Sequence, residues 1–331
     1  MTMNTDSLAI LVTGAGGFIG SHLVEALAAR GYRVRAFVRY NGRGDPGLLR
    51  DLPSDMRARI EIIFGDLHDS HAVHEATRGV DTIFHLGALI AIPYSYVHPR
   101  ETVETNIIGT LNVLEAARAH GVRRVVHTST SEVYGTARFV PITEEHPLQG
   151  QSPYSASKIG ADKLVESFHL SFGVPTVTVR PFNTYGPRQS ARAVIPTIIT
   201  QALTRSVVRL GDLRPTRDLN YVSDTVAGFL AAAERDQAIG QAINLASNDE
   251  ISIGELAEKI IALVGRQVTI DVDESRLRPE TSEVFRLHGD NRLAHELLGW
   301  KPLVSLDEGL RRTIDWIAQH IDRYDPLHYQ V

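Results

Sequence analysis

Short apolar runs alternate with helical patterns through the first half of the chain, and this alternation limits the folds available to it. The runs are rich in Val and Ile, and we predict six strands from them: Ala9–Thr13, Arg33–Val38, Ile60–Phe64, Thr82–Leu86, Arg124–Ser129 and Thr176–Arg180. Four predicted helices lie between the strands: Gly17–Arg30, Ser70–Arg78, Arg100–His120 and Pro153–Phe172. Such alternation is typical of βαβ units whose parallel strands are covered on both faces. Because crossovers are right-handed, we expect an α/β fold with a Rossmann-like, doubly wound parallel sheet.

The pattern changes after Arg180, where turn-rich sequence and isolated helices replace the alternation. The later predicted helices are Val194–Thr204, Asp224–Arg235 and Leu306–His320. We expect a smaller, discontinuous C-terminal α/β domain that binds substrate. The predicted division places residues 1–182 and 218–246 in a dinucleotide-binding domain, and residues 183–217 and 247–331 in the substrate domain.

Composition excludes several classes of protein. The sequence has no cysteine, so disulfides and thiolate metal sites are excluded. A net charge of -5 and a pI near 6.3 provide no general attraction to nucleic acid or to an acidic membrane. The short polar start and the lack of a run of about 20 apolar residues predict neither a signal peptide nor a membrane span. The histidines lack the spacing of metal ligands. We therefore expect a cytoplasmic protein with no metal, nucleic acid or membrane as partner.

Glycines cluster where the first strand meets the first helix, at Gly14, Gly17 and Gly20. Glycine permits a tight turn, and its missing side chain lets backbone N–H groups approach a pyrophosphate at the positive end of a helix. We expect Gly20 to let the helix pack closely on the sheet. A glycine-rich turn between a strand and a helix predicts a dinucleotide site.

The sequence leaves the choice between NAD and NADP open. An acidic residue at the end of the second strand would bind the ribose of NAD, but this strand ends in Phe37-Val38-Arg39-Tyr40-Asn41. Arg39 and Arg43 instead suit the 2′-phosphate of NADP, or are solvated surface charges. Asp66, followed by Leu67, suits the adenine edge, or caps the next helix.

A catalytic pair is predicted on the helix that begins near Ser152, a suitable N-cap, and Pro153. Tyr154 and Lys158 stand four residues apart, on one helical face. A nearby ammonium lowers the pKa of a phenol, which then takes a proton from a sugar hydroxyl while hydride passes to a nicotinamide. The small polar segment Thr128–Thr130, at the end of a strand, strengthens this interpretation.

With these motifs the chain resembles the extended short-chain dehydrogenases/reductases of the NAD-dependent epimerase/dehydratase family, which act on nucleotide-sugars. The matching segments are Thr13-Gly14-Ala-Gly-Gly17-Phe18-Ile19-Gly20, Asp66-Leu67, His85-Leu86-Gly-Ala88, Asn106, Tyr154-x-x-x-Lys158, Pro181-Phe-Asn183-Thr-Tyr-Gly-Pro187, Arg217-Asp218 and Tyr221-Val-x-Asp224. The resemblance implies a tightly bound, internally recycled NAD(P)+ that contacts the first three of these segments and also Tyr154 and Lys158. It also implies that Asn106 bends its helix and supports a proton relay through water. Finally, it implies a homodimer formed through the helices at Arg100–His120 and Pro153–Phe172.

The segment Thr130-Ser131-Glu132 bears on the reaction. A 4-epimerase only moves hydride at C4, whereas a 4,6-dehydratase needs a further base for the C5 proton, and Glu132 is our candidate. The triplet looks like that of GDP-mannose 4,6-dehydratases, but UDP-glucuronate decarboxylases carry it too. We expect a nucleotide-sugar 4,6-dehydratase, with an epimerase or a decarboxylase as alternatives. An inactive dinucleotide sensor is an alternative of another class, and it would need none of Tyr154, Lys158 and Glu132.

Other segments look most similar to dehydratases of UDP- or GDP-linked N-acetylglucosamine from legionaminic-acid-type pathways. These segments are Ala88–Tyr96, Arg188–Pro196 and Gly211–Asp218. Such enzymes are usually described as NAD-dependent, so the cofactor stays NAD(P). The residues that this resemblance assigns to the nucleotide-sugar are Asn183, Arg192, Arg217 and Arg278, and guanidinium groups suit phosphate.

Overall fold

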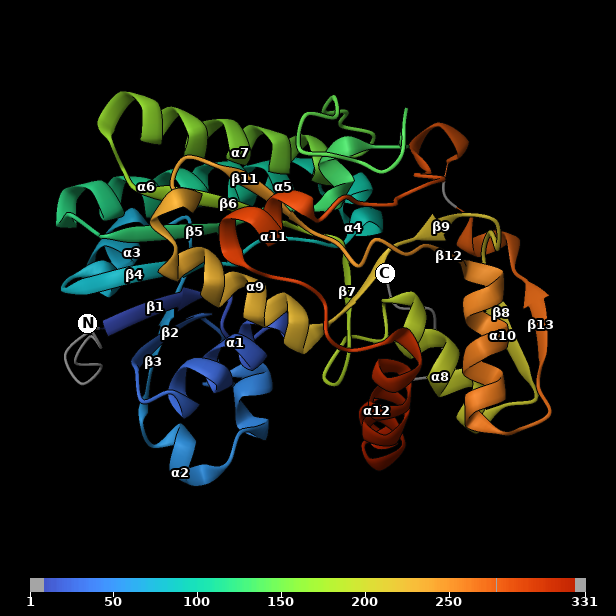
Figure 1. Cartoon of the computed structure of the whole chain (residues 1–331). Helices are drawn as coiled ribbons and strands as arrows, with labels where there is room; N and C mark the ends of the chain where they lie inside the picture. Colours follow the sequence, from blue (N-terminus) through green and yellow to red (C-terminus); the bar gives the residue numbers. More distant parts are fainter. Residues whose placement is uncertain (1–8, 278, 325–331) are drawn as a thin grey trace.

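The computed structural model describes residues 9–277 and 279–324, and its centre is a parallel sheet of seven strands (Figure 1). The strands are β1 (Ala9–Thr13), β2 (Arg33–Arg39), β3 (Ile60–Gly65), β4 (Val80–His85), β5 (Arg124–Thr128), β6 (Thr176–Pro181) and β11 (Ala242–Leu245). Their order across the sheet is β11-β6-β5-β4-β1-β2-β3. The six predicted strands are confirmed, with ends that differ by up to two residues. The order reverses beside β1, which is the arrangement of a doubly wound Rossmann-like fold.

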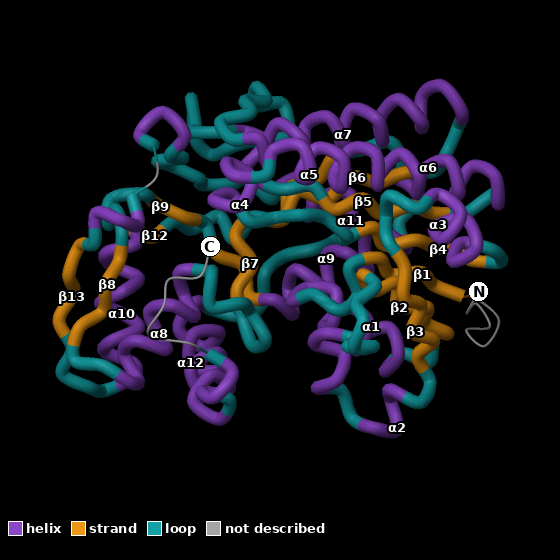
Figure 2. Tube along the Cα trace, turned by 180° about the vertical axis from the view of Figure 1, so that it is seen from behind, coloured by secondary structure: helices purple, strands orange, loops and turns teal. Residues whose placement is uncertain are grey.

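Helices cover both faces of this sheet (Figures 1 and 2). One face packs against α3 (Ser70–Thr77), α6 (Gly109–His120) and α7 (Pro153–Phe172). The other face packs against α1 (Phe18–Ala29) and α9 (Val222–Glu234). Shorter helices are α2 (Ser54–Arg57), α4 (Ile92–Val97), α5 (Pro99–Val103) and α11 (Arg292–Leu298). The strands are buried on both sides, which explains why they read as continuous apolar runs.

The helix predicted at Arg100–His120 is helical throughout, and a π-helical turn at Glu104–Ile108 lies within it, between α5 and α6. Asn106 lies in this turn, and its side chain makes two hydrogen bonds with the backbone of Leu89. It also donates to the hydroxyl of Ser157 on α7, over 2.9 Å. Asn106 therefore ties the segment after β4 to α7, and the bend expected at this residue stays a prediction. The water relay through Asn106 remains a prediction.

The later part of the chain forms a second group of elements beside the carboxyl ends of the strands (Figure 1). Its helices are α8 (Val194–Thr204), α10 (Ile253–Val264) and α12 (Leu306–Gln319). Its strands form three small pairs: β7 (Asn183–Tyr185) with β10 (Leu219–Tyr221), β8 (Val207–Leu210) with β13 (Thr269–Val272), and β9 (Thr216–Arg217) with β12 (Ile251–Ser252). The chain also returns to the large sheet as β11, which pairs with β6.

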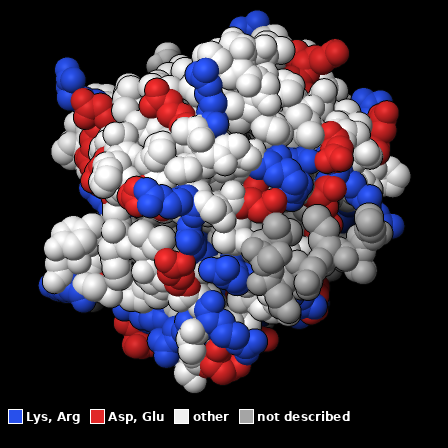
Figure 3. All heavy atoms as spheres, turned by 90° about the vertical axis from the view of Figure 1, so that its left-hand side faces the viewer, with Lys and Arg blue, Asp and Glu red and all other residues white. Residues whose placement is uncertain are grey.

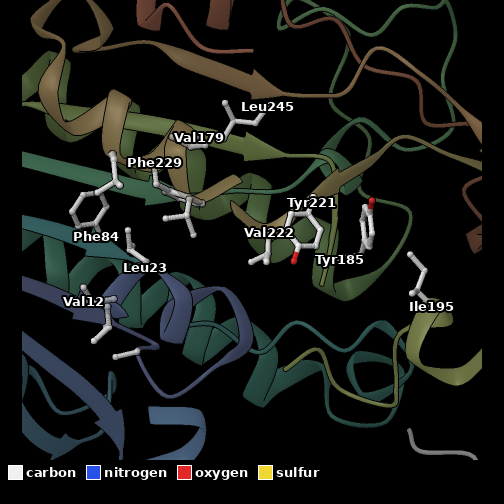
Figure 4. Close-up of a cluster of buried hydrophobic side chains, with 14 of the residues drawn as sticks. Val12, Leu23, Phe84, Val179, Tyr185, Ile195, Tyr221, Val222, Phe229 and Leu245 are labelled. Atoms are coloured by element: carbon white, nitrogen blue, oxygen red, sulfur yellow. The ribbon is translucent and has the colours of Figure 1, made fainter. Parts of the chain in front are cut away.

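One buried apolar cluster joins the two groups of elements (Figure 4). It extends from Val12 on β1, through Phe229 on α9, to Ile195 on α8. Tyr185 and Tyr221 lie in its middle, with ring centres 5.7 Å apart in an edge-on arrangement. The position of the second group relative to the sheet therefore depends on packed side chains.

The face at the left of Figure 1 carries basic and acidic side chains interspersed with one another (Figure 3). Within the described ranges, no helix combines the length and the apolar character needed to cross a membrane.

Candidate active site

The turn between β1 and α1 is packed too closely to accommodate a side chain at Gly14. Gly14 has a φ of +67°, a left-handed conformation that favours glycine. A Cβ at Gly14 would lie 2.8 Å from the backbone nitrogen of Gly87, which follows β4. Gly17 is the N-cap of α1, and no described side chain caps this helix. The first turn, with Phe18 and Ile19, therefore suits the pyrophosphate of a dinucleotide.

The predicted reason for Gly20 needs correction. A Cβ at Gly20 would collide with the carbonyl oxygen of Gly14, within the turn itself. The missing side chain is needed to close the turn, rather than to pack the helix on the sheet.

Charged side chains meet beyond the ends of β2 and β3. The Arg39 guanidinium lies 3.5 Å from the Glu101 carboxylate and 4.0 Å from that of Asp66. Asp66 accepts a hydrogen bond from the backbone of His68. The alternative of Asp66 as a helix cap is wrong, because Asp69 is the N-cap of α3. Arg39 thus lies between two carboxylates, which offset its positive charge.

The remaining residues assigned to the cofactor line the same edge of the sheet. Leu67 is buried, and a Cβ at Gly87 would lie 2.8 Å from its side chain. The backbone of Leu86 donates to Thr13 on β1, and Ala88 follows two residues later. His85 is buried and hydrogen-bonded to hydroxyl groups on both sides, which fits a structural role.

The start of α7 is fixed by its sequence, as predicted. Ser152 is the N-cap and shares a capping box with Ser155, and Pro153 occupies the first turn. The helix carries Tyr154 and Lys158 toward the carboxyl end of β5. Both side chains are buried there.

Two contacts join α7 to the segment after β5. The Lys158 ammonium donates to the carbonyl oxygen of Thr128 over 2.6 Å. The Tyr154 phenol is hydrogen-bonded to the Thr130 hydroxyl. Thr130 also accepts from the backbone of Glu132, and it caps the 3-10 turn η4 (Ser131–Tyr134). The structure therefore brings together all five predicted catalytic residues: Thr130, Ser131, Glu132, Tyr154 and Lys158.

Burial dominates the titration of the catalytic pair. It lowers the pKa of Lys158 to about 8. Burial also raises the pKa of Tyr154, the Thr130 hydrogen bond lowers it, and the Glu132 charge raises it further. The expected lowering of the Tyr154 pKa is therefore not found in the protein by itself. The Lys158 ammonium is bonded to Thr128, and the phenol has been moved out of water.

Glu132 lines a pocket of about 340 Å³ whose other lining residues come from the second group of elements. Asn183, Arg192 and Arg217 also line this pocket. Three of the four residues predicted for the nucleotide-sugar are thus brought to the same pocket as the predicted base. The fourth, Arg278, lies outside the described residues.

The pocket arginines have different surroundings. Arg217 pairs with Glu283 over 3.1 Å, and both side chains are nearly buried. It also donates to the carbonyl oxygens of Thr216 and Val284. Arg192 is exposed and bonds weakly to the Ser190 hydroxyl. Arg217 is therefore held rigidly in the wall, whereas Arg192 presents a more exposed charge.

Sequence reasoning missed three charged residues of this pocket, Asp212, Arg276 and Glu283. Arg276 and Glu283 lie on either side of Arg278 in the chain, and this closeness to a residue assigned to the nucleotide-sugar was the available signal. Spacing does not reveal that Glu283 meets Arg217, because these residues are far apart in the chain. Among the described residues, no group of three or more His, Asp or Glu could hold a metal ion.

The comparisons with known proteins agree with this geometry. Residues 11–313 match the family model described as GDP-mannose 4,6 dehydratase. The UDP-glucose 4-epimerase of Mycolicibacterium smegmatis is 34% identical over 313 residues, 92% of this chain and 97% of the relative. The dTDP-glucose 4,6-dehydratase of Streptomyces griseus is 34% identical over 324 residues, 96% of each chain.

A solved structure has the same fold. DesIV, a dTDP-glucose 4,6-dehydratase from Streptomyces venezuelae solved with NAD bound, superposes with a TM-score of 0.87 at 30% identity. The match covers 97% of this chain and 100% of DesIV. The chain therefore belongs to the GDP-mannose 4,6-dehydratase family, among the extended short-chain dehydrogenases/reductases of the NAD-dependent epimerase/dehydratase type.

Proposed function

We propose that the protein is a nucleotide-sugar 4,6-dehydratase that acts on UDP- or GDP-linked N-acetylglucosamine. One observation carries this proposal: Glu132 lines the substrate pocket while its charge acts on Tyr154. A carboxylate in this position is a third reactive group beside the Tyr154 and Lys158 pair. A 4-epimerase needs only the pair, whereas a dehydratase needs a base for C5 as well.

In this proposal Tyr154 accepts the proton of the C4 hydroxyl, and Thr130 orients the phenol. Lys158 supplies the positive charge that favours a phenolate. Once C4 is a ketone, the C5 proton becomes acidic and Glu132 removes it as the C6 hydroxyl leaves. Ser131 lies next to Glu132 and is the candidate for protonating the departing hydroxyl.

The residues that would hold a dinucleotide are the glycines of the β1–α1 turn and the edge formed by Arg39, Asp66, Leu67, Leu86 and Ala88. When bound there, a nicotinamide would supply the hydride-transfer chemistry for oxidation at C4 and reduction at C6. The carboxylates of Glu101 and Asp66 beside Arg39 disfavour a 2′-phosphate. This favours NAD, in contrast to the expectation from Arg39 alone.

The sugar nucleotide would occupy the pocket, with its phosphates near Asn183, Arg192 and Arg217. We retain the division of the chain into a dinucleotide-binding domain (1–182 and 218–246) and a substrate domain (183–217 and 247–331). The reaction would then occur where the two meet, at Glu132.

We also propose a homodimer formed through α5, α6 and α7. Val103 and Leu170, on α5 and α7, are 40% and 75% exposed. Leu114 on α6 is buried within the chain and does not contribute to this surface. The exposed part of this face is available to a second copy.

Product analysis tests the reaction. Purified protein is incubated with UDP-N-acetylglucosamine, GDP-N-acetylglucosamine or UDP-glucuronate, without added cofactor, and the products are followed by mass spectrometry. Loss of one water from an N-acetylglucosamine nucleotide, without net cofactor reduction, is the expected result. An inverted sugar of unchanged mass would instead identify a 4-epimerase, and loss of carbon dioxide from UDP-glucuronate a decarboxylase.

A further inference from the structure

A buried carboxylate lies beside the catalytic pair and has no part in the reaction proposed above. Asp162 lies on α7, one turn beyond Lys158, and it is 4% exposed. Its carboxylate accepts from the hydroxyl of Ser129 over 2.8 Å. It also accepts two hydrogen bonds from the Arg180 guanidinium, over 3.0 and 3.2 Å. A buried charge with this many partners is costly to build unless it is balanced.

These contacts place Asp162 in a row with the catalytic pair. Tyr154, Lys158 and Asp162 are spaced by four residues on α7, so they share one face of the helix. Tyr154 bonds to Thr130, Lys158 to the carbonyl of Thr128, and Asp162 to the residue between them, Ser129. Because Asp162 fixes the side chain of Ser129, it also restrains the two neighbouring residues. These are Thr128, which contacts Lys158, and Thr130, which contacts Tyr154.

We propose that Asp162 is a positioning residue of this active site, which keeps the Lys158 ammonium charged and fixes the Thr128–Thr130 segment against α7. The inference rests on the proposed function for the roles of Tyr154 and Lys158. Asp162 touches neither of the groups that would react, so it acts through Lys158 and Ser129.

The charges around Asp162 support this role. Among the described residues, six titratable or charged groups surround Lys158 and Asp162. His85 on β4, His127 on β5, Arg180 on β6 and Tyr154 on α7 interact with Lys158 or Asp162. From η4, Tyr134 approaches Arg180 and Glu132 approaches Tyr154. Glu144 approaches Arg180 from the loop before α7. Asp162 is the negative partner that both Lys158 and Arg180 share.

Of the six facing groups, the two histidines are neutral at neutral pH. Burial lowers the pKa of His127 to about 4 and the pKa of His85 well below its usual value. Burial raises the pKa of Tyr134 to about 12 and also raises the pKa of Tyr154. Burial lowers the pKa of Lys158 to about 8, and the charge of Asp162 opposes this effect. Removal of Asp162 should therefore make Lys158 lose its proton at a lower pH.

The chain offers a direct measurement, because it contains only four lysines: Lys158, Lys163, Lys259 and Lys301. Protein with ¹³C at the lysine Cε positions gives one NMR signal for each, and Lys158→Met assigns the signal of interest. Its titration midpoint is measured from neutral to alkaline pH in the wild type and in Asp162→Asn. This readout needs neither substrate nor turnover, so it stands even if the proposed reaction is wrong.

We expect a midpoint near 8 for Lys158 in the wild type and a lower midpoint in Asp162→Asn. The matched control is Asp224→Asn. Asp224 is equally buried, but its carboxylate accepts from the backbone of Leu303 and Val304, away from Lys158. Its variant should leave the Lys158 midpoint unchanged. An unchanged midpoint in folded Asp162→Asn would overturn the proposal.

Asp162→Asn leaves the Arg180 charge buried without its carboxylate, which destabilises the fold. The double variant Asp162→Asn with Arg180→Met removes both charges and should still lower the midpoint. Ser129→Ala separates the effect of Asp162 on the Lys158 charge from its effect on the Thr128–Thr130 segment, because it keeps the Asp162 charge and removes only the contact with Ser129. It should leave the midpoint in place and lower the rate of C4 oxidation.

Activity provides the second readout. In Asp162→Asn the alkaline limb of the rate–pH profile should move to lower pH. Above the limb, each pH unit of movement corresponds to about a tenfold loss of rate at fixed pH. A reduced rate with no movement of the limb would assign Asp162 a structural role only.

Discussion

The Lys158 ammonium donates a 2.6 Å hydrogen bond to the carbonyl oxygen of Thr128, at the carboxyl end of β5. This bond holds the Lys158 ammonium against the end of β5 rather than against the Tyr154 phenol. The lysine therefore contributes a fixed, buried positive charge, and the distance over which it acts on Tyr154 is set by β5.

The first prediction concerns the catalytic pair. Tyr154→Phe and Lys158→Met should each lower the rate of C4 oxidation by about 10²–10⁴-fold, the usual effect of a lost acid–base group. Single-turnover absorbance of reduced nicotinamide measures this step. Lys163→Met is the control, because Lys163 is exposed on the same helix and pairs with Glu166. Full activity in Tyr154→Phe would exclude Tyr154 as the catalytic base, whereas absence of turnover by the wild type would favour the sensor alternative.

The second prediction separates elimination from oxidation. Glu132→Gln should still oxidise C4, so reduced nicotinamide accumulates, but it should form little dehydrated product because the C5 base is missing. Absorbance and mass spectrometry of the same reaction measure the two steps. The exposed Glu145 provides the control variant, Glu145→Gln. Normal water loss in Glu132→Gln would exclude Glu132 as the C5 base.

The third prediction concerns cofactor choice. Wild-type protein should bind NAD more tightly than NADP, because Glu101 and Asp66 surround Arg39. Glu101→Gln should improve NADP binding by up to about fivefold, the scale of an exposed ion pair. Isothermal titration with both dinucleotides measures the preference. Tighter binding of NADP by the wild type would show that Arg39 is free to engage the 2′-phosphate despite its two carboxylates.

The sequence was sufficient for features that depend on local rules. The strands follow from apolar runs, and the start of α7 follows from Ser152 and Pro153. It was insufficient wherever distant residues meet. The raised pKa of Tyr154 results from burial by the whole fold. This burial cannot be inferred from the spacing of Tyr154 and Lys158 in the sequence. The Arg217–Glu283 pair and the contact of Asp162 with Arg180 likewise depend on how separate elements pack.

The fourth prediction concerns substrate affinity. Arg192→Ala should raise the KM for the nucleotide-sugar by about tenfold to a hundredfold, the worth of a charge-assisted hydrogen bond. Steady-state kinetics measure this effect, and kcat should change little. Arg209→Ala is the matched control, because Arg209 is exposed on β8 and is not a lining residue of the pocket. An equal effect of both variants would point to loss of general charge instead.

The fifth prediction concerns acid stability, through His22 on α1. Its Nε2 lies 2.9 Å from the carbonyl oxygen of Pro187, which makes this nitrogen the protonated one in the neutral ring. Burial lowers the pKa of His22 to about 4, from its usual 6.5. The unfolded state therefore binds more protons than the folded state between these pH values. It follows that the contribution of His22 to stability is lost as the pH falls through this window.

The change due to His22 is at most about 1.4 kcal/mol for each pH unit. In His22→Gln the amide can still donate to Pro187, but it does not titrate. The free energy of unfolding of the wild type should therefore fall more steeply from pH 6.5 to 4 than that of the variant. Denaturant titrations at several pH values measure both slopes. Parallel slopes would mean that His22 takes up its proton without leaving the fold, with Glu25 at hand to balance the charge.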